Sequence, residues 1–401
     1  MKKFIYIFAL SLLAVSCVYP YDSMPEKSVD NIVVEGDILL GEKSYFQISK
    51  VQPLDAPYSS RQTIPARVFV EGDNGYSKEA VEEFVNNEFR SVADLTDIKN
   101  EPGQASASYR LRVVLDNTII NGVNPGGGKE YVSEWIKPEG DMVLDNLSFS
   151  VDKAKDELAI RMSLHSGGLS QHFRYSYEED WEYTSYLRAT EYYIMPTEMN
   201  PYGQTASFNA SENIYYCWKH SESRGINLAT TEKMSESRLV DYPFKTFHHN
   251  DTKISLMYRI DLTVYPVSAG SYKYYENLKS ISSSSGDLFS PIPSAMRGNL
   301  SSVTDPEELV YGYIAVVFPK KARLYISDEE TDNFYHRDKI PEYQQEAVSP
   351  DQYFDKYLRG WRPYQKILME GDMWVSPAEC IDCRLLGGTK NKPADWPTSH
   401  E

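Results

Sequence analysis

The chain has 401 residues and a formal net charge of −17, from 58 acidic and 41 basic residues. A body this acidic repels phosphate backbones, so we expect no nucleic-acid partner. Aromatic residues make up 13% of the chain, and its 31 tyrosines favour a strand-rich protein over a helical one.

The start of the chain has the pattern of a lipoprotein signal peptide. Lys2 and Lys3 precede an apolar stretch over residues 4–15, and small residues lead to Cys17. Because a membrane-spanning helix needs about 20 apolar residues, this stretch is too short for a transmembrane anchor. We expect residues 1–16 to be removed and Cys17 to carry a covalent lipid that tethers a soluble body to a membrane. A plain signal peptide is the alternative, and we expect no other cofactor.

A short tether over residues 17–30 precedes the first group of predicted strands. Residues 31–51 contain two apolar runs broken by glycines, which predicts a strand, a turn and a strand. Alternation over residues 65–72, followed by the turn sequence DNG at residues 73–75, predicts a hairpin. The spacing of these segments predicts a mainly β fold that begins with an Ig-like antiparallel β-sandwich over residues 31–150. Further alternating segments lie at residues 108–116, 129–138 and 142–152.

The remaining residues, 151–401, are expected to form a second, larger β-rich domain with a few inserted helices. One helix is predicted near residues 269–283, with Ser268 as its cap, and another near residues 350–359, with Ser349 as its cap. The domain ends in a tail that contains two cysteines. Its tyrosine-rich alternating segments lie at residues 157–166, 173–183, 190–196, 213–220 and 254–266.

Several segments, taken in order, resemble one known family. The resemblance is to the domain of unknown function 4249 family, whose members are lipoproteins of Bacteroidetes-type bacteria, and it extends over roughly residues 28–397. The segments that carry it are IVVEGDI (32–38), FRYSYEEDWEY (173–183), YYCWKH (215–220), YRIDLTVYPVSAGSYKYYENL (258–278), GDLFSPIPSAMRGNLSS (286–302), VYGYIAVVF (310–318) and ECIDCRLLGGTKNKPADWP (379–397).

The resemblance implies a location and a class of partner, but no chemistry. Members look like outer-membrane lipoproteins, often encoded beside TonB-dependent receptors. We therefore expect anchoring to the outer membrane through Cys17, on the cell-surface side in preference to the periplasmic side. The sequence around Ser23 is similar to a three-residue O-glycosylation signal of such bacteria, which makes Ser23 a candidate modification site. No catalytic residues are established for the family, so the resemblance assigns none.

Three cysteines remain after Cys17, and thiols outside the cytosol tend to be oxidised. The favoured pairing joins Cys217 to Cys380 or Cys383, because closing a loop of roughly 160 residues contributes about 4–5 kcal/mol. A Cys380–Cys383 bridge is the alternative. A zinc site made of Cys217, His220, Cys380 and Cys383 is a third hypothesis.

The acidic stretch YSYEEDWEY contains the candidate catalytic side chains. Glu178, Glu179, Asp180 and Glu182 surround Trp181, and a pair of carboxylates could flank a glycosidic bond while the tryptophan stacks on a sugar. A solvated acidic edge with a buried tryptophan is the commoner outcome of such a pattern. The usual motifs of hydrolases and nucleotide-binding proteins do not occur in the sequence. We therefore assign no catalytic residue and favour a protein that is not an enzyme.

These observations predict a non-enzymatic accessory or ligand-binding partner of a TonB-dependent transporter. Tyrosine and tryptophan provide large amphipathic contact area, so the tyrosine-rich second domain is the expected binding region. Its ligand is expected to be a small molecule, a glycan or a peptide. The alternatives are a glycan or peptide hydrolase without a recognisable motif and a structural cell-surface adhesin.

Overall fold

The computed structural model describes most of the chain between residues 31 and 397. The expected signal peptide (1–16), the lipid site Cys17, the tether (17–30) and the candidate glycosylation site Ser23 lie outside the described residues. The described residues are 31–51, 63–85, 87–99, 106–115, 128–139, 142–167, 171–199, 201, 203–209, 213–283, 297–337, 339, 344–367 and 372–397.

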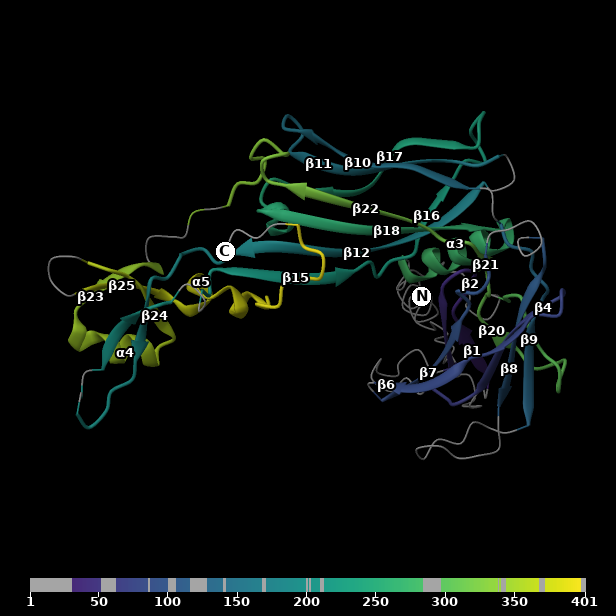
Figure 1. Ribbon diagram of the computed structural model, residues 1–401, viewed down its shortest axis with the longest axis horizontal. Coiled ribbons are helices and arrows are strands. Elements are labelled where there is room, and N and C mark those ends of the chain that lie inside the picture. Colours follow the sequence, from purple (N-terminus) through teal and green to yellow (C-terminus); the bar gives the residue numbers. More distant parts are fainter. Residues whose placement is uncertain are drawn as a thin grey trace, which may run out of the picture.

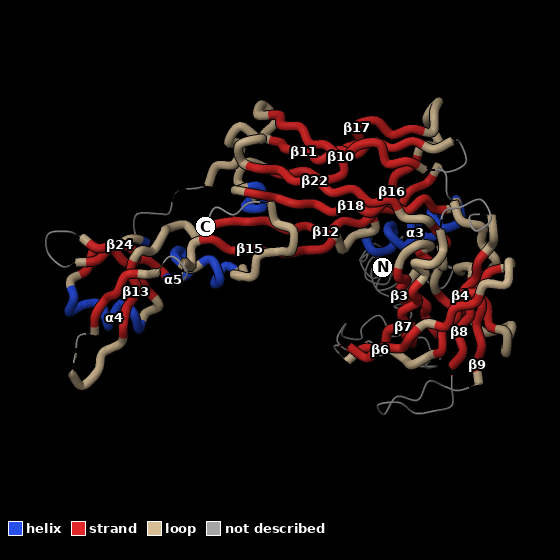
Figure 2. The backbone as a smooth tube through the Cα atoms, viewed as in Figure 1, coloured by secondary structure: helices blue, strands red, loops and turns tan. Residues whose placement is uncertain are grey.

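The fold is mainly β, which confirms the predicted class, and its three units follow one another along a long axis (Figure 1). A β-sandwich lies at one end, a larger β-sandwich lies in the middle, and a small mixed unit lies at the other end. We name this last unit the distal lobe, and it consists of the described residues within 190–209 and 344–386. Strands dominate the two sandwiches, the distal lobe combines strands with short helices, and the longest of the described helices lies between the two sandwiches (Figure 2).

The first sandwich consists of two five-stranded sheets with the orders β20-β1-β3-β7-β6 and β19-β9-β8-β4-β5. Side chains from both sheets, including Phe46 and Tyr109, are buried in one hydrophobic core. The two sheets therefore pack face to face. Their strands are β1 (Ile32–Glu35), β3 (Lys43–Lys50), β4 (Arg67–Gly72), β5 (Ser77–Glu79), β6 (Val81–Val85), β7 (Glu88–Asp94), β8 (Tyr109–Leu115), β9 (Lys129–Ser133), β19 (Leu300–Ser302) and β20 (Val310–Tyr311).

Local sequence explains how these strands form. β8 buries every second residue from Tyr109 to Leu115, because successive side chains of a strand point to opposite faces. The hairpin predicted at residues 73–75 is confirmed, since β4 pairs with β5 across it. Gly75 adopts a φ of 87°, which a glycine tolerates without strain, and its N–H donates to the Gly72 carbonyl at 3.1 Å.

A segment from late in the chain completes the first sandwich. It supplies β19 and β20, and also β21 (Val316–Val317), which pairs with β2 (Ile38–Leu39). The β1–β20 and β2–β21 pairs are parallel, so the sandwich contains parallel as well as antiparallel pairs. Asn299 fixes this return, because its side chain donates to the Ile314 carbonyl at 2.8 Å and accepts from the Ile314 N–H at 2.9 Å.

The middle sandwich packs a sheet of order β10-β11-β17 against a sheet of order β15-β12-β18-β22, in which β16 also pairs with β12. Ile160 and Phe247 of one sheet share a core with Tyr183 and Tyr258 of the other. Residues 143–150 belong to this sandwich and not to the first, because β10 pairs with β11. The strands are β10 (Val143–Asp152), β11 (Glu157–His165), β12 (His172–Thr184), β15 (Tyr216–Glu222), β16 (Asn227–Thr230), β17 (Arg238–Phe247), β18 (Met257–Val267) and β22 (Lys320–Ser327).

Helix α3 (Ala269–Ser283) lies where the two sandwiches meet (Figure 1). Its first turn is capped by Ser268, whose hydroxyl accepts a hydrogen bond from the Ser271 N–H at 3.2 Å. Tyr272 and Tyr275 face inward, and Tyr272 stacks against His172 of β12 with ring centroids 4.7 Å apart. The helix thus contacts β12 and β16 of the middle sandwich directly at the junction.

A buried ion pair connects the two sandwiches at this junction. Arg174 of β12 is paired with Asp37 of the first sandwich, and Asp37 also accepts a hydrogen bond from the Ala315 N–H at 3.1 Å. The Arg174 guanidinium lies over the rings of Tyr275, at 4.5 Å, and Tyr265, at 5.0 Å. This packing holds the arginine in one orientation, which favours a fixed angle between the sandwiches.

Replacement of Arg174 by methionine is expected to lower the free energy of unfolding by about 3 kcal/mol, because Asp37 is then left buried without its cation. Chemical denaturation of the purified protein measures the change. Arg323→Met is the matched control. Arg323 pairs with Asp261 on the surface, so we expect a loss below about 1 kcal/mol there. Equal losses in the two variants would contradict the structural role of the junction pair.

The distal lobe packs the β13–β14 hairpin and α4 around the sheet β23-β25-β24. Val348, Tyr353, Met373 and Val375 form its small core, with Tyr193 packed against them. Its elements are β13 (Glu191–Ile194), β14 (Gln204–Ser207), β23 (Glu346–Val348), the 3-10 turn η7 (Pro350–Gln352), α4 (Tyr353–Leu358), β24 (Trp361–Lys366), β25 (Met373–Pro377), α5 (Ala378–Ile381) and the 3-10 turn η8 (Cys383–Leu386).

Candidate functional site

The acidic stretch singled out in the sequence lies on β12, at the centre of the middle sandwich. Because strand side chains alternate, Glu179 and Trp181 point to one face of the sheet while Asp180 and Glu182 point to the other. All four side chains are buried, and Glu178 is the exposed acid of the stretch. The stretch therefore does not form the solvated acidic edge that the sequence predicted, although Trp181 is buried as predicted.

Glu179 is held between the two sheets by cations and hydroxyls. Its carboxylate accepts hydrogen bonds from Lys253 Nζ and the Tyr258 hydroxyl, both at 2.7 Å, and from Ser221 Oγ at 3.0 Å. Lys245 Nζ of β17 lies 3.4 Å away. Burial by itself raises the pKa of Glu179, but these hydrogen bonds and lysine charges outweigh it and leave the pKa below its ordinary value. Glu179 is thus ionised and committed to a structural cluster.

Asp180 forms a second cluster on the opposite face of the sheet. Its carboxylate accepts from Arg259 Nη2 at 2.6 Å and lies 3.0 Å from His220 Nδ1. Burial lowers the pKa of His220, but the hydrogen bond to Asp180 and the charges of Asp180, Glu178 and Glu222 raise it above its ordinary value overall. The Asp180 carboxylate therefore favours the charged form of the His220 imidazole.

The pKa of His220 is expected to lie above 6.5 in an NMR titration of the folded protein. Asp180→Asn should lower that pKa, because the variant removes the hydrogen-bonding carboxylate that favours the charged imidazole. A pKa that is unchanged in the variant would show that Asp180 does not control the charge of His220.

The C-terminal tail covers this same face of the sheet. Trp396 Nε1 donates to Glu182 at 3.2 Å, Arg259 donates to the Ala394 carbonyl at 2.8 Å, and the Tyr325 hydroxyl donates to the Asp395 carbonyl at 3.0 Å. These contacts close Glu182 off from solvent. The carboxylates around Trp181 are therefore used to hold the fold and the tail together.

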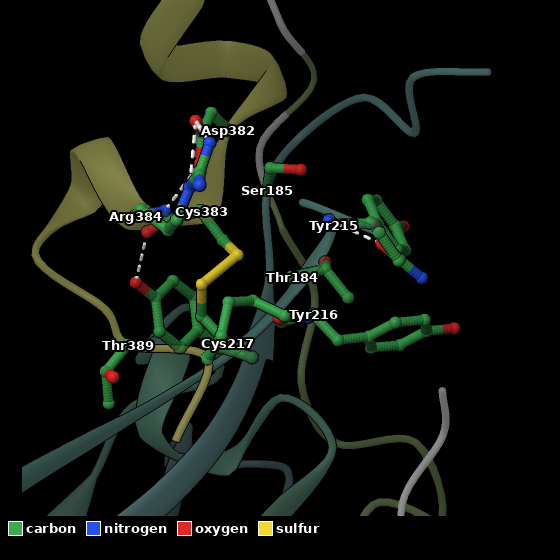
Figure 3. Close-up of a disulfide and its surroundings, with 12 residues drawn as sticks. Thr184, Ser185, Tyr215, Tyr216, Cys217, Asp382, Cys383, Arg384 and Thr389 are labelled. Atoms are coloured by element: carbon green, nitrogen blue, oxygen red, sulfur yellow. Dashed lines mark hydrogen bonds and ion pairs between the residues drawn. A yellow bond between two sulfur atoms is a disulfide. The ribbon is translucent and has the colours of Figure 1, made fainter. Parts of the chain in front are cut away.

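The tail is also joined to the middle sandwich by a disulfide between Cys217 of β15 and Cys383 of η8 (Figure 3). The bond closes a sequence separation of 166 residues, and both cysteines are fully buried. The Tyr183 hydroxyl donates to the Cys383 carbonyl at 2.7 Å, and Trp218 and Thr389 exchange backbone hydrogen bonds at 2.9 Å beside it. The sequence favoured a bond from Cys217 to Cys380 or to Cys383, and the bond to Cys383 is the one that forms.

The other cysteine hypotheses do not fit this arrangement. Cys380 is a free, buried thiol, and burial raises its pKa, which keeps it protonated and unreactive. The zinc set is not assembled, because Cys217 and Cys383 are bonded to each other and His220 is paired with Asp180. Within the described residues, no group of three or more histidine, cysteine or acidic side chains is placed to hold a metal ion.

A cavity of about 320 Å³ opens in the distal lobe between the β13–β14 hairpin, α4, β24 and the α5–η8 segment. We name it the aromatic cavity, because Tyr192, Tyr193, Phe208 and Tyr357 line it. The Tyr192 and Phe208 rings lie 5.1 Å apart, and those of Tyr193 and Tyr357 lie 5.3 Å apart. The Arg362 guanidinium covers the Tyr357 ring at 3.8 Å. An aromatic wall with a few fixed polar groups is typical of a site for small molecules.

A second cavity of about 320 Å³ adjoins the first, and we name it the polar cavity. Its wall includes Arg188, Thr190, Ser207, Asn209 and Asn213. Glu191 and Phe208 line both cavities, so these two residues form the partition between them. Aromatic side chains thus distinguish the wall of the first cavity, and hydroxyl and amide side chains distinguish the wall of the second.

Sequence reasoning did not identify this site. The one available signal was the pair Tyr192-Tyr193 in the segment at residues 190–196. On a strand, two consecutive tyrosines must face opposite sides, so one of them has to lie outside the core. Tyr193 packs on the core of the lobe, and Tyr192 is 37% exposed at the cavity. Phe208 and Tyr357 reach the same place only through tertiary packing.

A third, more open cavity of about 650 Å³ lies at one end of the middle sandwich and is lined by Lys153, Asp156, His249, Phe334 and His336. The Asp156 carboxylate accepts a hydrogen bond from the His249 N–H at 3.0 Å and lies 2.7 Å from His249 Nδ1. These hydrogen bonds hold the backbone at His249 in place. We assign the cavity no ligand.

None of the described helices has both the length and the apolar character that a membrane crossing requires. A search of the curated proteins found no match. A family profile with the description Domain of unknown function (DUF4249) matches residues 18–323. The match includes the first sandwich, the β13–β14 hairpin and the middle sandwich as far as the first half of β22, and it ends before the C-terminal segment 379–397 that also carried the resemblance. Because the matched residues make up more than half of the 401, the chain belongs to the family of the domain of unknown function DUF4249.

Proposed function

We propose that this chain is a lipid-anchored outer-membrane protein that serves as a non-enzymatic accessory to a TonB-dependent transporter and holds cargo in its distal lobe. The observation that carries the proposal is the pair of adjoining cavities in that lobe. Sites for small ligands are concave, aromatic and provided with a few polar groups, and this pair has all three properties.

The placement of the distal lobe supports the same role. The described chain begins at β1 in the first sandwich, which lies at the opposite end of the molecule from the distal lobe (Figure 1). Asn31 follows Cys17 by 14 residues, which span at most about 50 Å when extended. A lipid on Cys17 would hold the first sandwich close to the membrane, and the cavities would then lie at the end of the molecule away from the anchored sandwich.

The acidic stretch of β12 favours a binding role over hydrolysis. A glycosidase needs two carboxyl groups that reach the same bond of the substrate. Glu179 and Asp180 point to opposite faces of β12, and each is buried among its own cations. The two cavities of the distal lobe also favour a binding role over that of a purely structural adhesin, which needs no pocket.

The proposal predicts that the full-length protein, extracted from outer membranes in mild detergent and captured by an affinity tag, brings a β-barrel receptor with it. Mass spectrometry identifies the copurified proteins. Cys17→Ala is the matched control, because a chain that cannot be acylated leaves the membrane and should recover much less receptor. Recovery of the lipoprotein alone under these mild conditions would contradict the proposal.

A further inference from the structure

We propose that the aromatic and polar cavities are two adjacent subsites for consecutive residues of an uncharged oligosaccharide. The inference rests on the proposed function, because it names the class of cargo that the distal lobe would hold. Four observations support it: the size of the cavities, the two residues that line both, the different side chains that line each, and the backbone around them, whose groups are already hydrogen-bonded.

The size and connection of the cavities fit a chain molecule built of small units. Each cavity measures about 320 Å³, at the lower end of the range of about 300–1,000 Å³ for small-molecule sites. Neither is large enough for an extended cofactor. Because Glu191 and Phe208 line both, the cavities lie on either side of these two side chains, which is the arrangement needed for consecutive units of one chain molecule.

The aromatic cavity offers flat faces for the C–H side of a sugar ring. Tyr192 and Phe208 are tilted against each other by 49°, and Tyr192 is 37% exposed. The face of Tyr357 is already covered by Arg362. Tyr192 and Phe208 are therefore the rings with faces to offer, and Phe208 stands at the boundary of both cavities. Aromatic side chains bury much area at a low cost in side-chain entropy, which suits a weakly hydrophobic ligand.

The polar cavity supplies groups that match sugar hydroxyls. The hydroxyls of Thr190 and Ser207 already donate, to the Tyr364 carbonyl and to Glu191, so each can accept a hydrogen bond from a sugar hydroxyl. The amide side chains of Asn209 and Asn213 add further polar groups to the wall. Ser207 Oγ donates to Glu191 at 2.9 Å, which fixes the carboxylate at the boundary between the cavities. A ligand hydroxyl is itself both donor and acceptor, so such a wall can satisfy it in several orientations.

The charges around the cavities favour an uncharged ligand. Arg384 is neutralised by Asp382 at 2.6 Å, and the Nη1 group of Arg362 donates to the carbonyls of Tyr357 and Trp361. Arg188 and Glu191 carry opposite charges on the wall of the polar cavity. No cluster of like charge forms among these described residues, so an anionic or cationic ligand would gain little electrostatic stabilisation here.

The backbone around the cavities favours a glycan over a peptide. A peptide that adds to a sheet needs free backbone groups along a strand edge. At this hairpin the Thr190 N–H already donates to the Tyr364 carbonyl at 2.9 Å, and the Phe208 N–H donates to the Thr190 carbonyl at 3.0 Å. Side chains therefore form the recognition surface.

The test measures binding of maltotetraose, cellotetraose, xylotetraose and mannotetraose to the detergent-solubilised full-length protein, by saturation-transfer NMR and calorimetry. At least one of them is expected to bind. Tyr192→Ala should weaken that binding by about tenfold or more, since loss of a stacked ring is worth about 1.4 kcal/mol, and Tyr192→Phe should retain it. Tyr45→Ala is the matched control, because Tyr45 is a 48% exposed strand tyrosine of the first sandwich.

Three results would overturn the inference. The first is that no tetrasaccharide binds, and the second is that binding is unchanged in Tyr192→Ala. The third is that tetragalacturonate or a tetrapeptide mixture competes more strongly than any neutral sugar. The receptor copurification separates this result from the proposed function. Receptor recovery without sugar binding removes the glycan assignment alone, whereas sugar binding without a receptor keeps the subsites and removes the transporter partnership.

Discussion

Replacement of Glu179 by glutamine is expected to lower the free energy of unfolding by about 3 kcal/mol. The substitution keeps the shape of the side chain but removes the charge that compensates Lys245 and Lys253. Both lysine side chains are about four-fifths buried, with exposed fractions of 22% and 19%. Two cations without a counterion inside a sandwich are costly, because the protein interior solvates charge poorly. Chemical denaturation at neutral pH measures the loss.

The same variant should change how stability depends on pH. The pKa of Glu179 in the folded protein lies below its ordinary value of 4.5, so the unfolded chain takes up the proton more readily. The stabilisation from Glu179 is therefore fully present above pH 4.5 and is lost as the pH falls through the folded pKa. Glu179→Gln should lack this acid-sensitive component of stability.

Glu178→Gln is the matched control for both measurements. Glu178 is the neighbouring acid on the same strand, and it is exposed to solvent. We expect a change within about 0.5 kcal/mol in this variant. If Glu179→Gln unfolds at the same denaturant concentration as Glu178→Gln, the charge cluster inside the sandwich contributes nothing to stability and the account of β12 is wrong.

Loss of the disulfide is expected to have the largest single effect on stability. In Cys217→Ser the loop of 166 residues is no longer closed, and the chain-entropy estimate for a loop of this length is about 4–5 kcal/mol. The C-terminal tail is then held only by packing, such as that of Trp396 on Trp218 and Met257, and by hydrogen bonds such as that of Trp396 with Glu182. Denaturation of the oxidised wild type, the reduced wild type and the variant measures the effect.

Cys380→Ser separates the effect of the bond from that of a changed buried side chain. Cys380 is buried like the bonded cysteines but forms no disulfide. Its replacement should cost about 1 kcal/mol and should leave the sensitivity to reductant intact. A Cys380→Ser variant as unstable as Cys217→Ser, with no response to reductant, would indicate that Cys380, and not Cys383, is the partner of Cys217.

Much of the fold could be predicted from local patterns. Strand β8 follows from the alternation that ends at Leu115, and the β4–β5 hairpin follows from a turn that requires Gly75. Helix α3 could be located because inward-facing residues recur at spacings of three and Ser268 provides a cap. These features depend on neighbours in the sequence, which is why the sequence alone specifies them.

The parts that could not be predicted depend on distant pairing. Residues 300–317 complete the first sandwich, and no local pattern states which sheet a short strand will join. The choice between Cys380 and Cys383 as partner of Cys217 is decided by the course of the α5–η8 segment. The interdomain pair of Asp37 and Arg174 joins residues 137 positions apart.

The candidate site could not be predicted either, because it also depends on residues that are distant in sequence. The carboxylates of β12 are adjacent in sequence, yet alternation places Glu179 and Asp180 on opposite faces of the sheet. Each of them pairs there with cations from other elements of the fold. The aromatic cavity was missed because its walls come from β13, α4, β24 and the α5–η8 segment. A cavity assembled from four elements leaves little trace in any one of them, and here the only trace was the pair of consecutive tyrosines in β13.

The most direct test of the account is mass spectrometry of the protein isolated from its native membrane, digested without reduction. The account predicts a mature N-terminus at Cys17 that carries a lipid, together with a linked pair of peptides that contain Cys217 and Cys383. An intact Met1 terminus with free thiols at Cys217, Cys380 and Cys383 would contradict it, because the membrane anchor, the oxidising compartment and the transporter partnership would all be lost together.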